Sequence, residues 1–127
     1  MKELLDKVRE FQIASEQPVN DSPSIADMTN NFLRYTLMKE ENKEYATGCQ
    51  SNDLVEVLDA CADQLYVLLG TINQHGLQDV IGEAFERVHI NNMSKLIDGK
   101  IRRNPDGKIL KPIGFVKVEL NDLITLN

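Results

Sequence analysis

The sequence predicts an all-α protein, an antiparallel helical bundle of about four main helices followed by a short hairpin-like tail. Apolar residues recur at spacings of three and four in four successive segments, which is the helical period. Turn-forming Pro, Gly, Asn and Asp residues separate these segments. The chain has 127 residues, of which 42% are hydrophobic, and this size suits one compact domain with its own core. We therefore expect a single domain over residues 1–127, with a helical core to about residue 97 and a basic tail over about 98–127.

The first two helices flank a segment rich in turn residues. Apolar spacing predicts a short amphipathic helix over about residues 2–16. Residues 17–24 include two prolines, two serines, an asparagine and an aspartate, and are expected to form an exposed connection. The second helix begins near Ser24 or Asp27, since either side chain can cap backbone N–H groups. Gly48 is expected to end it.

The third helix is the most apolar segment of the chain. It is expected to start at Ser51 or Asn52 and to run to about Gln74, with Gly76 closing it. Its second half is apolar nearly all round, so we expect it to be central or packed within an oligomer. A fourth helix is predicted over about residues 77–96.

The tail differs in texture from the rest of the chain. Residues 104–107 (Asn-Pro-Asp-Gly) lie between two short β-favouring stretches, 101–103 and 108–110. Such a tetrapeptide favours a turn that joins two extended arms.

Composition also bears on location. The chain has only two cysteines, no charged-then-apolar leader, and no apolar run near the ~18 residues of a membrane span. We expect a cytoplasmic protein with reduced thiols and no membrane partner.

Charge is distributed unevenly along the chain. The formal net charge is −6, yet residues 40–63 hold seven acids and one base, whereas residues 95–117 hold seven bases and two acids. Net acidity argues against nonspecific nucleic-acid binding, which needs a broad basic face. A basic strip beside an acidic cluster suits a metal-bound polyphosphate. The two patches are therefore predicted to face each other, within one chain or between chains.

Acidic residues on the second and third helices form the candidate metal site. They recur at helical spacings that put each group on one face, and they are Glu40, Glu41, Glu44, Glu56, Asp59 and Asp63. Asp59 and Asp63 interrupt an apolar stretch, where an uncompensated buried carboxylate is costly. Carboxylates without a nearby His or thiolate are ligands of a hard cation, Mg²⁺ or Mn²⁺. The alternative is that both groups are solvated helix faces, but two matched clusters favour a metal.

A family resemblance rests on these acids. Glu40-Glu41-Asn42-Lys43-Glu44 followed by Glu56-Val57-Leu58-Asp59 resembles the EExxE…ExxD signature of the all-α nucleoside triphosphate pyrophosphohydrolase superfamily, which includes MazG proteins, dimeric dUTPases and phosphoribosyl-ATP pyrophosphohydrolase. Stretches at 59–71, 84–89, 92–95 and 106–112 resemble its MazG-like, phosphoribosyl-ATP pyrophosphohydrolase-like branch. The resemblance covers roughly residues 30–112 and implies one MazG-like domain.

This resemblance implies hydrolysis of a nucleoside triphosphate to a monophosphate and pyrophosphate. It implies that the ligands of Mg²⁺ are Glu41, Glu44, Glu56 and Asp59, with Asp63 a further ligand or, in an alternative alignment, the last ligand in place of Asp59. The ion would neutralise polyphosphate charge and orient the attacking water. Glu40 is the candidate general base, because it needs only to accept a proton from a water within hydrogen-bonding distance.

Polar and basic residues of the fourth helix and the tail are the candidate substrate ligands. Polyphosphate oxygens that a metal does not hold favour charge-assisted donors, and the candidates are Asn92, Lys95, Arg102, Arg103, Lys108 and Lys111. For any one of them the alternative is a solvated surface side chain. Five more side chains are candidates for stacking on or reading a base, although core packing is favoured for each: Phe11, Gln12, Phe32, Tyr35 and Tyr66.

The expected function is a Mg²⁺-dependent nucleoside triphosphate pyrophosphohydrolase that cleans the nucleotide pool, assembled as a homodimer or tetramer. Phosphoribosyl-ATP hydrolysis in histidine synthesis is the alternative within enzymes. A noncatalytic helical homodimer with a structural or regulatory cation site is the alternative outside them.

Overall fold

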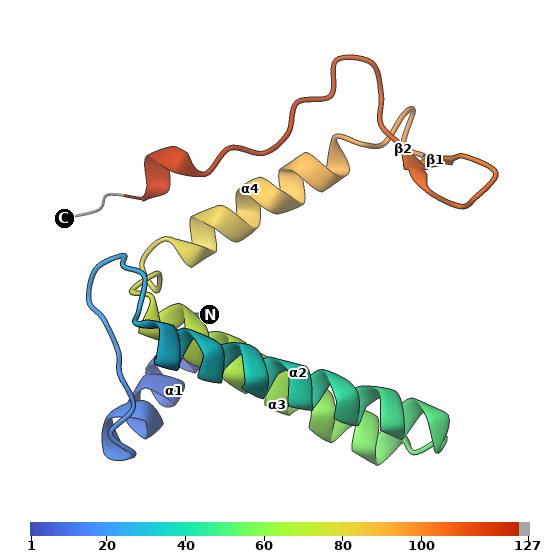
Figure 1. Ribbon diagram of the computed structural model, residues 1–127. Helices are drawn as coiled ribbons and strands as arrows, with labels where there is room; N and C mark the ends of the chain where they lie inside the picture. Colours follow the sequence, from blue (N-terminus) through green and yellow to red (C-terminus); the bar gives the residue numbers. More distant parts are fainter. Residues whose placement is uncertain (125–127) are drawn as a thin grey trace. The chain divides into compact units, whose positions relative to one another are not determined.

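The protein is all-α, as predicted (Figure 1). A computed structural model describes residues 1–124, and the last three residues of the predicted tail lie outside this range. The elements in chain order are α1 (Lys2–Ala14), α2 (Met28–Gln50), α3 (Leu54–Gln74), α4 (Ile81–Met93), β1 (Arg102–Arg103), β2 (Ile109–Leu110) and the 3₁₀ helix η1 (Asn121–Leu123). Among the described helices, none is both long enough and apolar enough to cross a bilayer.

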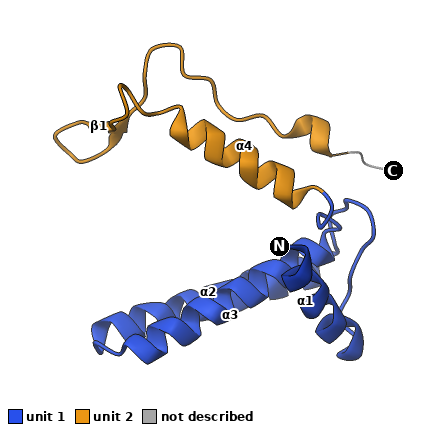
Figure 2. Ribbon diagram, turned by 180° about the vertical axis from the view of Figure 1, so that it is seen from behind, with its two compact units in different colours: residues 1–79, 126–127 blue, residues 80–125 orange. Residues whose placement is uncertain are grey.

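The chain divides into two compact units (Figure 2). The helical unit comprises residues 1–79 and holds α1, α2 and α3. The C-terminal unit begins at residue 80 and holds α4, the two strands and η1. In this division α4 belongs with the tail and not with the other helices. The prediction of a single domain over residues 1–127 stays a prediction.

Side-chain caps define the starts of α2 and α3. Asp27 is the N-cap of α2, and its carboxylate accepts from the backbone N–H of Asn30 at 2.9 Å, which decides between the two predicted starts. Asp53 caps α3 in the same way, through the N–H of Glu56 at 3.1 Å, so the predicted start at Ser51 or Asn52 is wrong by two residues or fewer. Asp53 reaches an N–H three residues ahead, as a capping aspartate should.

Glycines act differently at the two ends of the α2–α3 pair. Gly48 does not end α2, which continues to Gln50. A Cβ at Gly48 would lie 3.1 Å from the backbone nitrogen of Val57, so this glycine permits close approach of the two helices instead. Gly76 does close α3 as predicted, with a φ of +66°, a conformation that glycine adopts without strain.

The predicted fourth helix is too long at both ends. α4 begins at Ile81 and ends at Met93. It starts later than predicted because residues 77 and 78 are tied back to the helical unit. The N–H of Leu77 donates to the carbonyl of Ile72 at 3.0 Å, and the side chain of Gln78 donates to the carbonyl of Asn20 at 2.9 Å.

The helical unit is built around α3. The helices α2 and α3 run antiparallel along each other, and α1 packs against α3 (Figure 1). The buried apolar side chains are Leu5 and Val8 of α1 and Ala60, Leu69 and Ile72 of α3. Apart from Ala60, this core lies toward the C-terminal end of α3, so fewer buried apolar side chains hold the other end of the α2–α3 pair.

The C-terminal unit contains the predicted hairpin. Arg102 pairs with Leu110 and Arg103 with Ile109 in an antiparallel register. The turn is closed by the N–H of Gly107, which donates to the carbonyl of Asn104 at 2.9 Å. The Asn-Pro-Asp-Gly segment therefore forms the turn that its composition predicted.

Candidate metal centre

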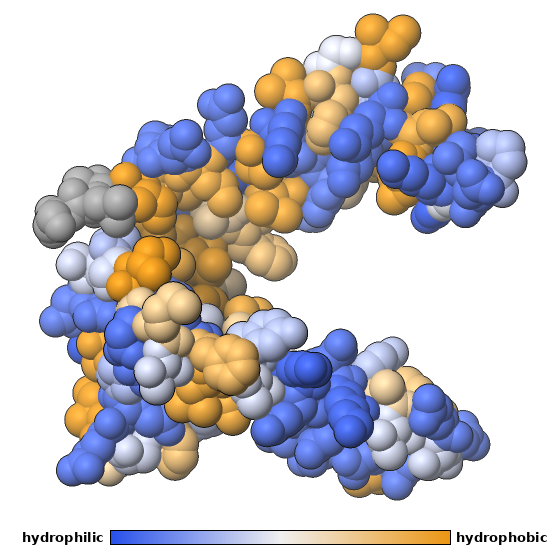
Figure 3. All heavy atoms as spheres, in the orientation of Figure 1, coloured by the Kyte–Doolittle hydropathy of each residue, from blue (hydrophilic) through white to orange (hydrophobic). Residues whose placement is uncertain are grey.

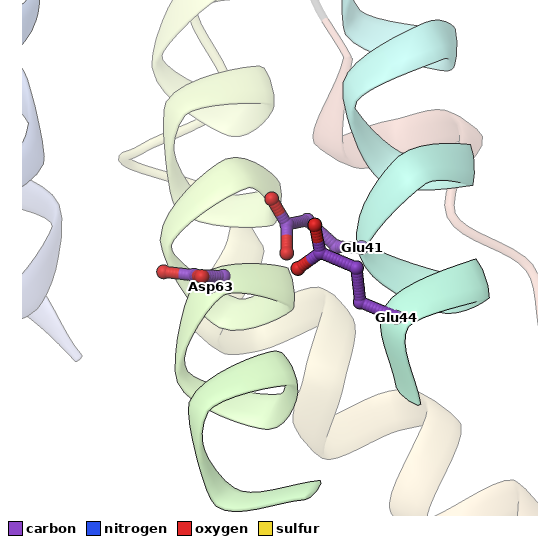
Figure 4. Close-up of side chains that lie close together, drawn as sticks. All are labelled: Glu41, Glu44 and Asp63. Atoms are coloured by element: carbon purple, nitrogen blue, oxygen red, sulfur yellow. The ribbon is translucent and has the colours of Figure 1, made fainter. Parts of the chain in front are cut away.

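Three carboxylates from α2 and α3 converge on one place. Glu41 and Glu44 project from α2 toward α3, where Asp63 lies (Figure 4). Each of the three offers one carboxylate oxygen, and these oxygens all lie within 4.8 Å of one another. We call these residues the acidic trio. Glu41 and Asp63 are half-buried and Glu44 is exposed.

The helical period explains why Asp63, and not Asp59, completes the trio. Ala60 is fully buried against the neighbouring helices. Asp63 follows Ala60 by three residues and Val67 follows Asp63 by four, so all three lie on the inner face of α3. Asp59 is exposed, which contradicts the expectation that it lies on the buried side. One residue turns a helix by about 100°, enough to carry Asp59 outward.

Burial and like charge act together on the trio. Burial, together with the charges of Glu44 and Asp63, a hydrogen bond with Glu44 and the charge of Asp59, raises the pKa of Glu41 to about 7. The Oε2 atom of Glu41 is buried and has no hydrogen-bond partner among the described residues. A buried acceptor without a donor costs free energy, so the site favours a proton or a cation.

These three oxygens fit a hard divalent cation. Mg²⁺ holds oxygen ligands at about 2.0–2.1 Å, so two ligands on opposite sides of the ion lie about 4 Å apart. A spacing within 4.8 Å needs only a small side-chain adjustment to reach that distance. The donor set of three carboxylates matches the preference of Mg²⁺ or Mn²⁺ for hard oxygen ligands.

The other acids predicted for this site lie outside the trio. Glu40 precedes Glu41 on α2 and is exposed. Glu56 packs its side-chain carbons where Gly48 crosses α3, with its Cβ 3.2 Å from the position that a Cβ on Gly48 would take. Asp59 contributes charge to the environment of Glu41. Their roles as base and ligands stay predictions.

The predicted substrate-binding residues all belong to the C-terminal unit. Lys95 donates to the Oδ1 of Asn92 at 3.0 Å, and Arg103 donates across the turn to the carbonyl of Gly107 at 2.8 Å. The ammonium of Lys111 lies 5.2 Å from the ring centre of Phe115. Arg102 and Lys108 are exposed on the hairpin. Whether this group faces the acidic trio stays a prediction.

Sequence reasoning missed Arg34. This residue of α2 is only 6% exposed and donates to groups of α3. Arginine is rarely buried, so composition gave no reason to suspect it. A signal was nevertheless present, because Arg34 precedes Glu41 by seven residues, which is two helical turns, and therefore lies on the same face of α2.

The fold and the acidic trio together define an all-α protein with a carboxylate cluster that could hold a cation. The family model described as phosphoribosyl-ATP pyrophosphohydrolase matches the chain over residues 8–92, a range that contains the whole trio. The protein therefore belongs to the phosphoribosyl-ATP pyrophosphohydrolase family, within the MazG-like nucleoside triphosphate pyrophosphohydrolase superfamily. Comparison with curated proteins gives no match. Membership of this family supports a pyrophosphohydrolase enzyme that acts on a nucleotide.

Proposed function

We propose that this protein is a Mg²⁺-dependent nucleoside triphosphate pyrophosphohydrolase that releases a nucleoside monophosphate and pyrophosphate, and that it cleans the nucleotide pool. The observation that carries this proposal is the acidic trio. Its three oxygens lie within 4.8 Å of one another, and a buried oxygen of Glu41 has no donor among the described residues.

Glu41, Glu44 and Asp63 would hold the cation, and Glu56 and Asp59 are proposed as additional ligands from the family signature. When bound, Mg²⁺ or Mn²⁺ supplies charge neutralisation on the polyphosphate and orients its reacting group. Glu40 would accept the proton of the attacking water, since it is an exposed carboxylate that directly precedes Glu41 on α2. The trio itself repels free polyphosphate, so substrate binding should depend on the cation.

The C-terminal unit would supply the donors for the polyphosphate. Its candidates are Asn92, Lys95, Arg102, Arg103, Lys108 and Lys111. Lysine and arginine form charge-assisted hydrogen bonds with phosphate oxygens and stabilise charge that develops during transfer. In this proposal the bases come from the same chain or from a second copy.

A second copy of the chain is the proposed partner. Large apolar side chains on the α2–α3 pair are unusually exposed for a monomer: Phe32 at 68%, Leu54 at 79%, Val55 at 77% and Leu58 at 69%. Exposed apolar surface of this kind marks interaction sites, and it occurs at the end of the pair that holds Leu54, Val55 and Leu58 and at the opposite end, which holds Phe32. We expect a homodimer or tetramer by light scattering after size exclusion.

Replacement of Glu41 tests the proposed activity. In Glu41→Gln we expect Mg²⁺-dependent pyrophosphate release to fall at least about 100-fold, because even residues behind a metal ligand contribute about 10–100-fold. The matched control is Glu10→Gln, an exposed acid of α1, which should keep parental turnover. Unchanged turnover in a folded Glu41→Gln protein would exclude the assigned site.

Phosphoribosyl-ATP is the second candidate substrate, favoured by the description of the matching family. A panel of phosphoribosyl-ATP, dUTP, dCTP and the common triphosphates, with pyrophosphate as the readout, separates the two. Preferred turnover of phosphoribosyl-ATP would assign the protein to histidine synthesis. Hydrolysis of none of them, with thermal stability still raised by Mg²⁺ or Mn²⁺, would favour the noncatalytic cation-binding homodimer.

A further inference from the structure

Arg34 is a buried charged residue whose hydrogen-bond partners are all neutral. Its side chain donates from Nε to the hydroxyl of Thr71 at 3.2 Å, from Nη2 to the carbonyl of Val67 at 3.0 Å, and from Nη1 to the side-chain carbonyl of Gln17 at 3.3 Å. Among residues 1–124 no carboxylate forms an ion pair with it. Burial lowers the pKa of Arg34. A guanidinium has five N–H donors, so two of them have no partner within the described chain.

A buried amide framework lies beside Arg34. Gln12 and Asn73 are each only 1% exposed. The side chain of Gln12 donates to the carbonyl of Gly70 at 2.9 Å and accepts from Asn73 at 3.1 Å. A Cβ on Gly70 would lie 2.8 Å from Nη2 of Arg34, so the absence of a side chain there makes room for the guanidinium.

A cavity of about 200 Å³ lies beside this framework, between α1, α2 and α3. Its lining residues are Val8, Phe11, Gln12, Gln17, Arg34, Leu37, Tyr66 and Val67. Phe11 and Tyr66 meet edge to face, with ring centres 5.9 Å apart. The side-chain amide of Gln12 is already bonded at both ends. The cavity therefore has apolar and aromatic walls, and Arg34, which has two N–H donors without a partner among the described residues, is one of its lining residues.

The cavity lies on the same face of the α2–α3 pair as the acidic trio. Arg34 and Glu41 are two helical turns apart on α2, which corresponds to about 10 Å along the axis. Tyr66 follows Asp63 by three residues on α3, which is about one turn. A nucleoside monophosphate has a length of the same order, so one ligand could reach from the cavity to the trio.

We propose that this cavity binds the base of the substrate and selects a 6-oxopurine, such as hypoxanthine or guanine. This inference rests on the proposed function only in placing the phosphates of the substrate at the acidic trio; binding of the base does not depend on it. A 6-oxopurine presents two neighbouring acceptors, O6 and N7, which suit an arginine bidentately. Adenine carries an amino group at position 6. This group is a hydrogen-bond donor and could not bond to the N–H donors of Arg34. Deaminated purine nucleotides would then be the material that this enzyme removes.

Inosine and adenosine test base selection without phosphate or metal, because they share the same sugar and differ only in the group at position 6 and in the proton that inosine carries on N1. We expect inosine to bind the whole protein at least about tenfold more tightly than adenosine, since a good bidentate pair discriminates between bases by about this factor or more. NMR titration of the amide signals of Gly70 and of the Gln12 side chain is the measurement. Adenosine binding as tightly as inosine, or no binding of either, would overturn the proposal.

Gln17→Glu probes the role of Arg34 while keeping its side chain. A carboxylate at this position would pair with Nη1, which lies 3.3 Å from the present oxygen, and would compete with the base for the guanidinium. We expect the preference for inosine to fall at least about fivefold while the thermal melting point is kept or raised. Gln50→Glu, at an exposed glutamine that ends α2, is the matched control and should leave the preference unchanged. A Gln17→Glu protein with undiminished preference would contradict the role of Arg34.

Failure of the proposed function and failure of this inference are distinguishable. Inosine selectivity in a protein that hydrolyses no nucleotide would remove the enzyme and keep the base pocket. Equal Mg²⁺-dependent turnover of ITP and ATP, with no inosine preference, would keep the enzyme and remove the pocket.

Discussion

The two ends of the α2–α3 pair treat charge in opposite ways. At the end near the helix connection, Glu41, Glu44 and Asp63 bring three like charges within 4.8 Å. At the other end, Arg34 is one buried charge with hydrogen bonds to two carbonyl oxygens and a hydroxyl. Figure 3 shows hydrophilic residues gathered toward the first end and apolar ones near the second.

This difference indicates how each end would receive a ligand. Repulsion within the trio is relieved only by an added proton or cation, so the acidic end is less stable empty than filled. Three neutral hydrogen-bond acceptors keep Arg34 buried without a counter-ion, so its guanidinium ties α2 to α3 while two of its N–H donors have no partner among the described residues. Predictions about the acidic end therefore concern charge, whereas predictions about the Arg34 end concern packing.

The largest expected effect separates Asp63 from its exposed neighbour. In Asp63→Asn we expect Mg²⁺-dependent pyrophosphate release to fall at least about 100-fold, since ligand loss should exceed the about 10–100-fold effect of residues behind a ligand. Asp59→Asn is the matched control and should lose less than Asp63→Asn, because Asp59 lies outside the trio. Steady-state turnover at saturating Mg²⁺ measures both. A larger loss in Asp59→Asn would reverse the assignment.

Binding of a cation to the acidic trio should raise the free energy of unfolding. Mg²⁺ at about 100 times its dissociation constant should add about 2.7 kcal/mol to the free energy of unfolding, measured as a rise in the thermal midpoint. Glu41→Gln should respond far less, and without metal it should melt above the parent, because one of the repelling charges is gone. Equal Mg²⁺ responses in parent and variant would contradict this view of the trio.

Packing at the Arg34 end should tolerate added volume poorly. Gly70→Ala places a methyl group 2.8 Å from Nη2 of Arg34, and we expect a loss of about 1–3 kcal/mol in the free energy of unfolding. Gly82→Ala on α4 is the control, since its Cβ would meet nothing within 4 Å. That change should be neutral or stabilising by up to about 1 kcal/mol. Urea unfolding curves provide both values, and equal values would remove the contrast.

The smallest effect is a pH dependence of the metal-free protein. The pKa of Glu41 is raised from an ordinary value of 4.5 to about 7. Its contribution to stability is therefore fully present below about pH 4.5 and is lost as the pH rises through about 7. Glu41→Gln should flatten this part of the profile, as measured by urea unfolding without metal. The same slope in parent and variant would show that another group titrates.

Local patterns were sufficient to predict most of the fold. Helical spacing, the capping Asp27, the left-handed Gly76 and the Asn-Pro-Asp-Gly turn act over a few residues, so their effect is visible in the sequence. The prediction that Gly48 ends α2 was wrong because its role is set by Val57 on another helix. A long-range contact of this kind leaves no local signature.

The sequence was sufficient to predict a cluster of carboxylates but not which residues form it. Two acidic groups at helical spacing on consecutive helices predict a carboxylate cluster between them. Spacing alone could not choose between Asp59 and Asp63, because both continue the pattern. The choice depends on which face of α3 packs against α2, and that follows from the burial of Ala60.

The sequence by itself determined an all-α chain, its helices to within a few residues, its acidic and basic segments and its membership of a pyrophosphohydrolase family. Those properties follow from the order of the residues and from interactions a few positions apart. Only the tertiary structure decided that Asp63 joins Glu41 and Glu44, and that Arg34 is buried beside a cavity between α1, α2 and α3. The physical reason is that burial and electrostatic coupling depend on which helix faces meet in space.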